Sequence, residues 1–590
     1  MCGIFGYYNT HGLSLDKSII QDMADVIQYR GPDGLGVFEQ AGLALGNQRL
    51  AILDVENGSQ PFISDDEQIV VVQNGEIFNH VELAEALAET PFACRTHCDT
   101  EVILRLYEQK GPEFVELLNG MFAIAIWDKR SNELFLFRDR VGEKPLHYHS
   151  LNGQLIFGSE IKSILAGGID KKLNKDALDS FLAFNYVAPP LTMFEGVSHV
   201  MPGHYLKFSD NGLEDIQWWD AAAIEIQEKA ESEWIVSFNR VLDDATRIRL
   251  RSDVPFGAFL SGGVDSSSVV GLMSKHMDQP VETFTIGFHD PKYDESPFAA
   301  TAAARFNTKH TCEKVEANLL DLWPKVIRHC DQPHGDVSFM PTYRVAELAS
   351  RKVKMVLTGD GADELFAGYD KYKYFFADEN VFGLKESEFR SKYLDNISLF
   401  KLGVRSRLYS ESFKQDIDLN KTSEMLDPLF ERSSNMDRIN QALYIDIMLL
   451  LPGNNLVKPD RMGMAVSIEN RAPFLDVRML ELALSMPGQL KLHGGETKYI
   501  YKKAVSDLIG EDLTYRKKQM FTVPIGEWLK TDLKDMVHDL LFSDRANSRG
   551  VFNSDFVSWL YTSHCDGNEN HTREIRALMA IELWFREFMD

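Results

Sequence analysis

One stretch of this chain restricts its fold more than any other: an apolar strand that runs through a glycine-rich turn into a helix. Residues 255–260 (PFGAFL) have the composition of a strand, residues 261–267 (SGGVDSS) form the turn, and the helical pattern continues to residue 276. Further strand-like runs at 282–288 and 354–358 alternate with helical stretches. This alternation predicts a parallel sheet with helices on both faces.

The turn at residues 261–267 has the chemistry of a phosphate site. Its glycines let the backbone approach an anion closely, while free N–H groups at the helix start, serine hydroxyls and the helix dipole attract negative charge. Asp265 is placed to hold a cation. The segment matches neither a Walker A loop nor the GxGxxG fingerprint. An ordinary serine-capped turn would not need two adjacent glycines, so we expect a phosphate site of another type.

A second acidic loop supports this interpretation. Residues 356–369 (VLTGDGADELFAGY) again run from a strand into a glycine turn, and Asp360, Asp363 and Glu364 bring several negative charges together. Such crowding is costly without a cation. Mg²⁺ is bound by one or two carboxylates together with phosphate oxygens, so the loop predicts Mg²⁺ beside a bound nucleotide.

The first part of the chain is rich in strand signals. Residues 120–127 and 134–137 predict a hairpin, and the apolar run 68–73 stops at Asn74-Gly75, a pair typical of a turn. Helical patterns at 81–89 and 100–109 complete a mixed α and β domain. The character changes near residue 211, and a long charged helical stretch then leads to Arg251. We therefore expect one domain at 1–211 and a second at 212–590 that is mainly helical from about residue 370.

Composition excludes several classes of protein. The formal net charge of -26 argues against a broad nucleic-acid surface. No apolar run is as long as a membrane span, and the chain lacks a signal-peptide pattern at its start, so no membrane partner is expected. Six cysteines in 590 residues are too few for a disulfide framework, which favours a cytoplasmic location.

Cys2 directly follows the initiator methionine. Removal of Met1 would leave one residue with both a thiol and a free α-amino group. The reference pKa of the amine, roughly 7.7–8.0, lies below that of the thiol, about 8.5, so the amine can act as the base for its own thiol. The alternative is a cysteine without a role at a chain terminus, and Cys2 alone does not decide between them.

Together, these features resemble the glutamine-dependent asparagine synthetase family over essentially the whole chain. In that family a class II glutamine amidotransferase domain precedes an ATP pyrophosphatase domain, whose phosphate loop has the form SGGxDS. The resemblance implies an N-terminal α+β sandwich of antiparallel sheets with flanking helices, of the N-terminal-nucleophile type, and a Rossmann-like α/β second domain. It is carried by Cys2 to Ile4, Arg30 to Asp33, Arg49-Leu50, Asn74 to Asn79, Asp99 to Glu101, Arg138 to Arg140, Ser159 to Lys162, the two loops, Asp460 to Met462, Glu469 to Asp476 and Lys498.

The resemblance implies a glutaminase site in the first domain. Cys2 would attack the side-chain amide of glutamine and form a thioester, with the Asn74 side chain and the Gly75 N–H as the oxyanion hole; donors aimed at developing charge contribute strongly to acyl transfer. Arg49 would hold the α-carboxylate of glutamine, and Glu76 and Asp99 its α-ammonium. The implied glutamine-binding residues are Arg49, Leu50, Ala51, Ile52, Leu53, Asn74, Gly75, Glu76 and Asp99.

In the second domain the family implies that the β-carboxylate of aspartate attacks the α-phosphate of ATP. Pyrophosphate leaves, and ammonia that has travelled inside the protein displaces AMP to give asparagine. Asp265 and Asp363 would hold Mg²⁺, Lys498 would neutralise charge at the transferring phosphate, and Asp360 would complete the catalytic residues. The implied ATP-binding residues are Phe259, Leu260, Ser261, Gly262, Gly263, Asp265, Ser266, Ser267, Ile286, Thr358, Gly359 and Lys498.

Departures from the family pattern leave the acceptor open. Asp360 stands where some members carry glutamate, Gly46-Asn-Gln precedes Arg49 where Gly-His is usual, and Ala367 and Gly463 replace commoner residues. The alternatives are an amidotransferase that amidates another carboxylate, a ring-closing β-lactam synthetase or lasso-peptide cyclase, and a non-catalytic nucleotide-binding regulator. Ring-closing relatives typically lack the glutaminase cysteine. The expected partners are glutamine, aspartate and ATP, with the homodimer that is frequent in the family.

Overall fold

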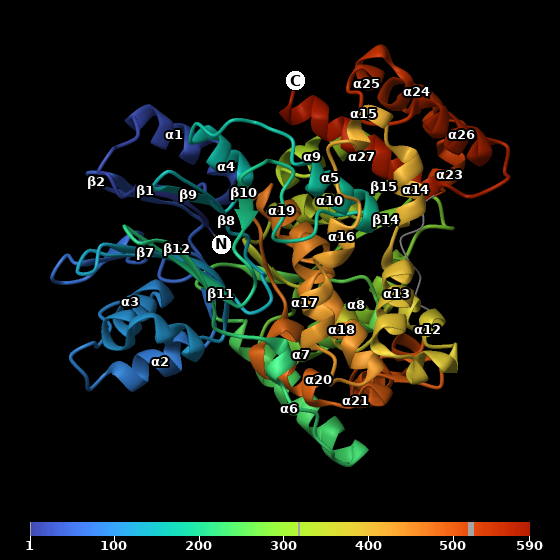
Figure 1. Ribbon diagram of the computed structural model, residues 1–590. Helices are drawn as coiled ribbons and strands as arrows, with labels where there is room; N and C mark the ends of the chain where they lie inside the picture. Colours follow the sequence, from blue (N-terminus) through green and yellow to red (C-terminus); the bar gives the residue numbers. More distant parts are fainter. Residues whose placement is uncertain (1, 317–318, 517–523) are drawn as a thin grey trace.

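The computed structural model describes residues 2–316, 319–516 and 524–590 (Figure 1). Its first domain contains a pair of antiparallel sheets. One sheet has the order β10 (Val197–His199), β8 (His147–Leu151), β9 (Gln154–Gly158), β1 (Gly3–Asn9), β3 (Leu43–Arg49), β2 (Gly34–Gln40). The other has the order β12 (Gly212–Gln217), β11 (His204–Ser209), β7 (Glu133–Arg138), β6 (Gly120–Asp128), β5 (Ile69–Ile77), β4 (Phe62–Ile63).

These sheets pack face to face as a sandwich. Apolar side chains from both, such as Leu45 of β3 and Val72 of β5, fill the shared core. The outer faces are covered by helices, α1 (Lys17–Asp25) and α4 (Ile161–Ala166) on the first sheet and α2 (His80–Leu87) and α3 (Asp99–Lys110) on the second, while α5 (Lys175–Phe184) packs with helices of the second domain (Figure 1). The expected α+β sandwich with flanking helices is confirmed.

The hairpin predicted at 120–137 is confirmed as β6 and β7, but the turn predicted at Asn74-Gly75 is wrong. Both residues lie within β5, where Asn74 pairs with Ala123 and Gly75 with Phe122. A Cβ on Gly75 would lie only 2.0 Å from the Met121 carbonyl oxygen. The glycine therefore permits close approach of two strands, which is the other reason that a strand interior contains glycine.

The second domain is built on a parallel sheet with the order β15 (Lys309–Val315), β14 (Glu282–Phe288), β13 (Phe256–Phe259), β16 (Met355–Leu357), β17 (Glu469–Arg471). Neighbouring strands are parallel throughout this order. Alternate residues of β16 face opposite cores: Met355 and Leu357 enter the main core of the domain, while Val356 enters the smaller one. The α/β prediction is confirmed, since helices cover both faces.

The helices of the second domain confirm that the chain is mainly helical beyond residue 370. The stretch expected to be helical before Arg251 is shorter than predicted, because its helix begins only at Glu231. The short strands β18 (Leu492–His493) and β19 (Glu496–Thr497) form a small separate sheet. The helices are α6 (Glu231–Ile248), α7 (Val264–His276), α8 (Ser296–Arg305), α9 (Trp323–Cys330), α10 (Phe339–Ser350), α11 (Ala362–Leu365), α12 (Asp370–Phe375), α13 (Glu386–Ile397), α14 (Leu402–Leu408), α15 (Glu411–Lys414), α16 (Lys421–Glu424), α17 (Asp427–Arg432), α18 (Arg438–Met448), α19 (Val457–Met464), α20 (Val477–Ser485), α21 (Tyr499–Ile509), α22 (Glu511–Thr514), α23 (Ile525–Trp528), α24 (Lys534–Phe542), α25 (Asp544–Ser548), α26 (Ser554–Cys565) and α27 (Thr572–Phe588).

The hairpin of β11 and β12 spans the position where the sequence predicts the domain boundary. Ser209 pairs with Gly212, so residues on either side of position 211 belong to the same sheet. We therefore propose that the first domain extends through Gln217, the last residue of β12.

Among the described residues, the helices are too short or too polar to cross a membrane.

Buried ion pairs join the two domains. Arg30 of the first domain makes a bidentate contact with Asp460 of α19 (2.9 and 3.1 Å) and a contact of 2.8 Å with Glu160. Arg461 also reaches Glu160, at 2.9 Å. Loss of one partner from such a pair would leave an uncompensated buried charge, which is strongly destabilising. These ion pairs come from sequence motifs without an assigned catalytic role. They lie at the domain junction and hold the two domains together.

Candidate active sites

Cys2 lies buried at the start of β1, at the junction of the domains. Its main-chain N–H donates to Asn74 Oδ1 (3.1 Å), and its carbonyl accepts from Arg30 Nε (3.1 Å). Burial raises the pKa of the Cys2 thiol, and the side chain of Asn47 and the backbone of Leu50 partly oppose this by hydrogen bonding. A thiol with a raised pKa is protonated at neutral pH, so catalysis requires a base beside it.

Asn47 is a site residue to which the sequence assigns no role. The sequence indicated this residue only as a departure from the family pattern. The segment before Arg49 reads Gly46-Asn-Gln where the family usually has Gly-His, and Asn47 is the residue after the glycine. The structure places its side chain against the thiol of Cys2, and its Nδ2 donates to the Gln73 carbonyl (2.9 Å). Met1, whose removal would release the amine of Cys2, lies outside the described residues.

The implied oxyanion donors belong to the middle of β5. Asn74 Nδ2 donates to Ser159 Oγ (3.3 Å), and the same hydroxyl accepts from the main-chain N–H of Ile4 (3.0 Å). Asn74 is therefore fixed from both ends of its amide, by Cys2 and by Ser159. A side chain held in this way costs little reorganisation when charge develops beside it.

Arg49 at the end of β3 organises the loop that follows it. Its guanidinium donates to the carbonyls of Leu53 (3.3 Å), Asp54 (2.8 Å) and Val55 (3.0 Å). At the start of this loop, the N–H of Ala51 donates to Asp33 Oδ2 (2.8 Å). Leu50, Ala51 and Ile52 are buried, and Leu53 is half-buried. The segment implied to bind glutamine is therefore a loop held in place by these hydrogen bonds, and its carbonyl groups face the guanidinium of Arg49.

Two buried carboxylates complete this site. Asp99, at the N-terminus of α3, accepts hydrogen bonds from Gln73 Nε2 (3.1 Å) and from the Ile77 N–H (2.9 Å). Burial and the nearby Asp99 raise the pKa of the Glu76 carboxyl, while Arg471 of the second domain lowers it. Adjacent acids in a buried site suit a cationic ligand such as an α-ammonium group.

The phosphate loop has the geometry that its composition predicts. Gly262 has φ +71°, and a Cβ on it would lie 2.3 Å from the Phe298 carbonyl carbon, so only glycine fits. Ser261 Oγ lies 3.1 Å from Ser266 Oγ and accepts from the Gly263 N–H (3.3 Å). Ser267 Oγ is buried and has no hydrogen-bond partner among the described residues.

The residues implied to bind the nucleotide come from neighbouring strands of the parallel sheet and from the loops that follow them. Leu260 is buried, and its N–H donates to the Phe284 carbonyl (3.0 Å), while Phe259 at the end of β13 and Ile286 within β14 are half-buried. The acidic loop packs against the phosphate loop, since a Cβ on Gly359 would lie 2.6 Å from Asp265 Cβ. The structure therefore brings both predicted loops to one edge of the sheet.

Lys498 lies between the two carboxylates predicted to hold Mg²⁺. Its Nζ is 2.6 and 2.7 Å from the carboxylate oxygens of Asp265 and 2.7 Å from Asp363 Oδ1. Burial alone would lower the pKa of Lys498, but the two carboxylates outweigh this and raise it. Lys498 also has φ +55°, a strained conformation for a residue with a side chain, and such strain concentrates at functional sites.

An open pocket lies over this lysine. Its walls include the phosphate loop, Asp363 and Lys498, together with three cations that the sequence did not single out: Lys373, Lys502 and Arg516. Arg516 Nε donates to the Gly262 carbonyl (3.0 Å), which fixes it at the phosphate loop. In the acidic loop, Thr358 Oγ1 donates to Asp360 Oδ2 (2.7 Å), and burial raises the pKa of Asp360.

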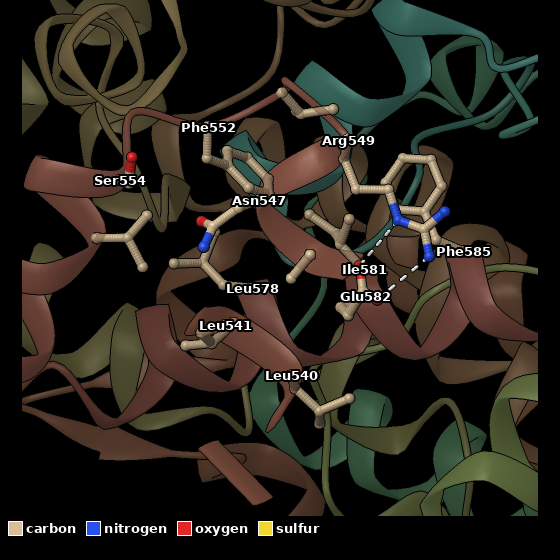
Figure 2. A pocket seen from close by; sticks show the side chains of 13 residues that line it. Leu540, Leu541, Asn547, Arg549, Phe552, Ser554, Leu578, Ile581, Glu582 and Phe585 are labelled. Atoms are coloured by element: carbon tan, nitrogen blue, oxygen red, sulfur yellow. Dashed lines mark hydrogen bonds and ion pairs between the residues drawn. The ribbon is translucent and has the colours of Figure 1, made fainter. Parts of the chain in front are cut away.

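A different and smaller cavity lies among the C-terminal helices α24 to α27 (Figure 2). Its walls are mostly apolar, with Leu540, Leu578 and Phe585 among them. Figure 2 also shows Arg549 and Glu582, which form an ion pair with two contacts of 3.2 Å, so their charges neutralise each other. The residues that line it include no cysteine, histidine, lysine or glycine-rich turn, so the chemistry is sought at the other two sites.

Comparison with known proteins agrees with this geometry. Residues 237–586 match the family described as "Asparagine synthase", and residues 1–219 match "Glutamine amidotransferase domain". The chain belongs to the asparagine synthetase family. It is 32% identical to "Asparagine synthetase [glutamine-hydrolyzing] 1" of Bacillus subtilis (strain 168), over 99% of this chain and 96% of that protein.

Two further relatives show the range of this family. "Asparagine synthetase [glutamine-hydrolyzing] 3" of Bacillus subtilis (strain 168) is 30% identical, over 92% of each chain. "Amidase chyE" of Penicillium rubens is 27% identical, over 95% of this chain and 93% of that protein. The protein is therefore a glutamine-dependent, ATP-using ligase of the asparagine synthetase type, with its acceptor carboxylate still to be assigned.

The two carboxylates beside Lys498 fit a bound Mg²⁺ in charge and direction. Asp265 and Asp363 already converge on one cation, the ammonium of Lys498. In the described part of the chain, no three His, Cys, Asp or Glu side chains converge as a metal site. Mg²⁺ bound by two carboxylates draws its remaining ligands from phosphate and water, so we propose that Asp265 and Asp363 hold Mg²⁺ only together with ATP.

From the proposed oxyanion role of Asn74, we expect Asn74→Ala to lower kcat for glutamine hydrolysis by roughly 10²–10³-fold, because the site would lose a fixed donor. The KM for glutamine should change little, since Arg49, Glu76 and Asp99 remain. Steady-state glutamate release measures both constants. A rise in KM with unchanged kcat would instead place Asn74 in ground-state binding.

Proposed function

We propose that this protein is a glutamine-hydrolysing asparagine synthetase. The reaction converts L-aspartate, L-glutamine, ATP and water into L-asparagine, L-glutamate, AMP and diphosphate. The observation that carries the proposal is the pairing of a buried N-terminal cysteine site with a lysine-centred phosphate loop in one chain. Buried ion pairs at Arg30 and Arg461 hold the two sites in a fixed relation.

In the first site the terminal amine accepts the thiol proton of Cys2, and the sulfur attacks the amide carbon of glutamine. Asn74 Nδ2 and the Gly75 N–H stabilise the oxyanion. The carbon–nitrogen bond then breaks and ammonia leaves with the transferred proton, which produces a glutamyl thioester. Water hydrolyses the thioester, giving glutamate and restoring the thiol.

In the second site the β-carboxylate of aspartate attacks the α-phosphorus of ATP, and the bond to pyrophosphate breaks. Lys498 and the phosphate loop neutralise the charge that develops on the phosphate oxygens. Mg²⁺ at Asp265 and Asp363 would add further charge neutralisation. Ammonia then attacks the acyl carbon and AMP leaves. Asp360, whose pKa is raised by burial, is suited to accept the proton that the attacking nitrogen loses.

We propose that ammonia reaches this site through the junction, as an uncharged molecule. Apolar residues of the first domain, including Leu50, Ile52 and Met121, belong to the same buried core as Leu260 and Leu357 of the second. An apolar passage favours neutral ammonia over ammonium, because an unpaired ion in such surroundings carries a large desolvation cost.

The second candidate function is amidation of a carboxylate other than aspartate. The similarity to amidase chyE over nearly the whole chain favours keeping this candidate, since its name is not that of an asparagine synthetase. Both functions share the two sites described above and differ only in the acceptor. We propose aspartate first, because the relatives with higher identity are named asparagine synthetases.

The acceptor can be identified by pyrophosphate release. With ATP, Mg²⁺ and glutamine present, we expect L-aspartate to raise the release rate at least roughly tenfold above a blank without acceptor, because pyrophosphate leaves only when a carboxylate attacks. Glutamate, succinate and other carboxylates serve as the comparison panel. An asparagine product of matching yield completes the assignment. If another acid drives release while aspartate gives no more than the blank, the amidation of a different carboxylate replaces our proposal.

A further inference from the structure

The glutamine site receives a charged residue from the second domain. Arg471, the last residue of β17, is buried, and its Nη2 lies 3.4 Å from Glu76 Oε1. The same guanidinium donates to Glu469 Oε1 (2.5 Å) and to the carbonyls of Arg249 (2.9 Å) and Arg251 (2.6 Å). Because these bonds fix the guanidinium plane, its charge is directed at Glu76 and cannot swing away.

The main chain of Arg471 belongs to the nucleotide site. Its carbonyl accepts a hydrogen bond from the Thr358 N–H (2.9 Å), and Leu357 of β16 lies opposite it in the parallel ladder. Thr358 in turn donates to Asp360. One residue therefore touches the glutamine site with its side chain and the acidic loop with its main chain. Substitution of the side chain leaves the second contact in place.

We propose that Arg471 is a positioning residue of the glutamine site, whose guanidinium favours the ionised form of the Glu76 carboxylate against the effect of burial and orients this carboxylate toward the α-ammonium group of glutamine. This inference rests on the proposed role of Glu76 in glutamine binding. Its consequence is that the glutaminase site is incomplete without the second domain. A buried carboxylate that lost this partner would favour its neutral form and lose its attraction for an ammonium ion.

The charges that face Glu76 determine the sign of the pH effect. Burial raises the pKa of Glu76, Asp99 of α3 and Glu469 of β17 raise it further, and Arg471 lowers it, so that the pKa stands well above its usual value. Removing Arg471 should therefore raise the pKa of Glu76, so that glutamine binding is lost at a higher pH. Removing the charge of Glu469 should lower the pKa and extend binding to a lower pH.

The test compares full-length variants by glutamine hydrolysis between about pH 5.5 and pH 9. For Arg471→Met we expect the KM for glutamine to rise about tenfold near neutral pH and the acid limb of kcat/KM to move upward by roughly 1 pH unit. The kcat at saturating glutamine and ammonium-dependent pyrophosphate release should change less than about twofold. Glu469→Gln, which keeps the guanidinium, should move the acid limb in the opposite direction.

Arg251→Met is the matched control, because Arg251 bonds Glu82 across the same junction (2.5 Å) but does not contact Glu76. It should leave the acid limb in place. Equal effects of Arg251→Met and Arg471→Met, a parallel loss of ammonium-dependent activity, or an unmoved acid limb in Glu469→Gln would each overturn the inference. Absence of glutamine hydrolysis by the unmodified protein would overturn the proposed function itself, and the inference with it.

Discussion

Replacing Cys2 by alanine should abolish glutamine-dependent amidation and leave ammonium-dependent amidation intact. The substitution removes the only atom that forms the proposed thioester, and loss of a catalytic nucleophile costs on the order of 10⁴–10⁶ in kcat. Lys498 and the phosphate loop lie in the other domain and keep their contacts. Parallel assays with glutamine and with ammonium chloride as nitrogen donor measure the two outcomes.

Cys330→Ala provides the matched control, because Cys330 is also a buried cysteine but belongs to α9. Both activities should survive this change. If Cys2→Ala removed the ammonium-dependent reaction as well, the separation into two sites would be wrong. Intact-mass measurement of the unmodified protein should also show loss of Met1, since the proposed base is the amine that this processing releases.

The phosphate loop was predictable because its signal is local. A strand, two glycines and a helix start lie within a few residues, and Gly262 indeed needs its positive φ. Asn74-Gly75 shows the limit of the same reasoning. Hairpin turns and close strand approach both require glycine, so the pair alone could not distinguish a turn from the interior of β5. The family resemblance, rather than the turn signal, indicated the site.

Strand β17 was not predicted, and with it the role of Arg471 was missed. Its three residues, Glu469, Asn470 and Arg471, are polar and show no apolar alternation. Their place in the sheet depends on pairing with β16, a strand more than 100 residues earlier in the chain. Buried polar strands of this kind are defined by tertiary contacts, and periodicity cannot reveal them.

Substitution of Lys498 by alanine should stop amidation from either nitrogen donor while glutamine hydrolysis continues. We expect pyrophosphate release to fall roughly 10³-fold, because a cation at the transferring phosphate contributes an effect of that order. The resemblance implied this lysine, but its position between Asp265 and Asp363, each more than 100 residues earlier in the chain, required the structure. Glutamate release, measured in the same samples, reports on the first site.

Lys503→Ala is the control, since Lys503 lies on helix α21, which Lys498 precedes as its N-cap, but is exposed and pairs with Glu231. It should retain both reactions. Lys498→Ala removes the ammonium that lies between Asp265 and Asp363, so Mg²⁺ should raise its melting temperature more than that of the unmodified protein. Mg²⁺ supplies positive charge but, unlike a flexible lysine side chain, cannot move with the phosphate during the reaction. We therefore expect Mg²⁺ to restore the stability of the Lys498→Ala variant but not its rate of amidation. Recovery of both by Mg²⁺ would reduce Lys498 to a structural counter-ion.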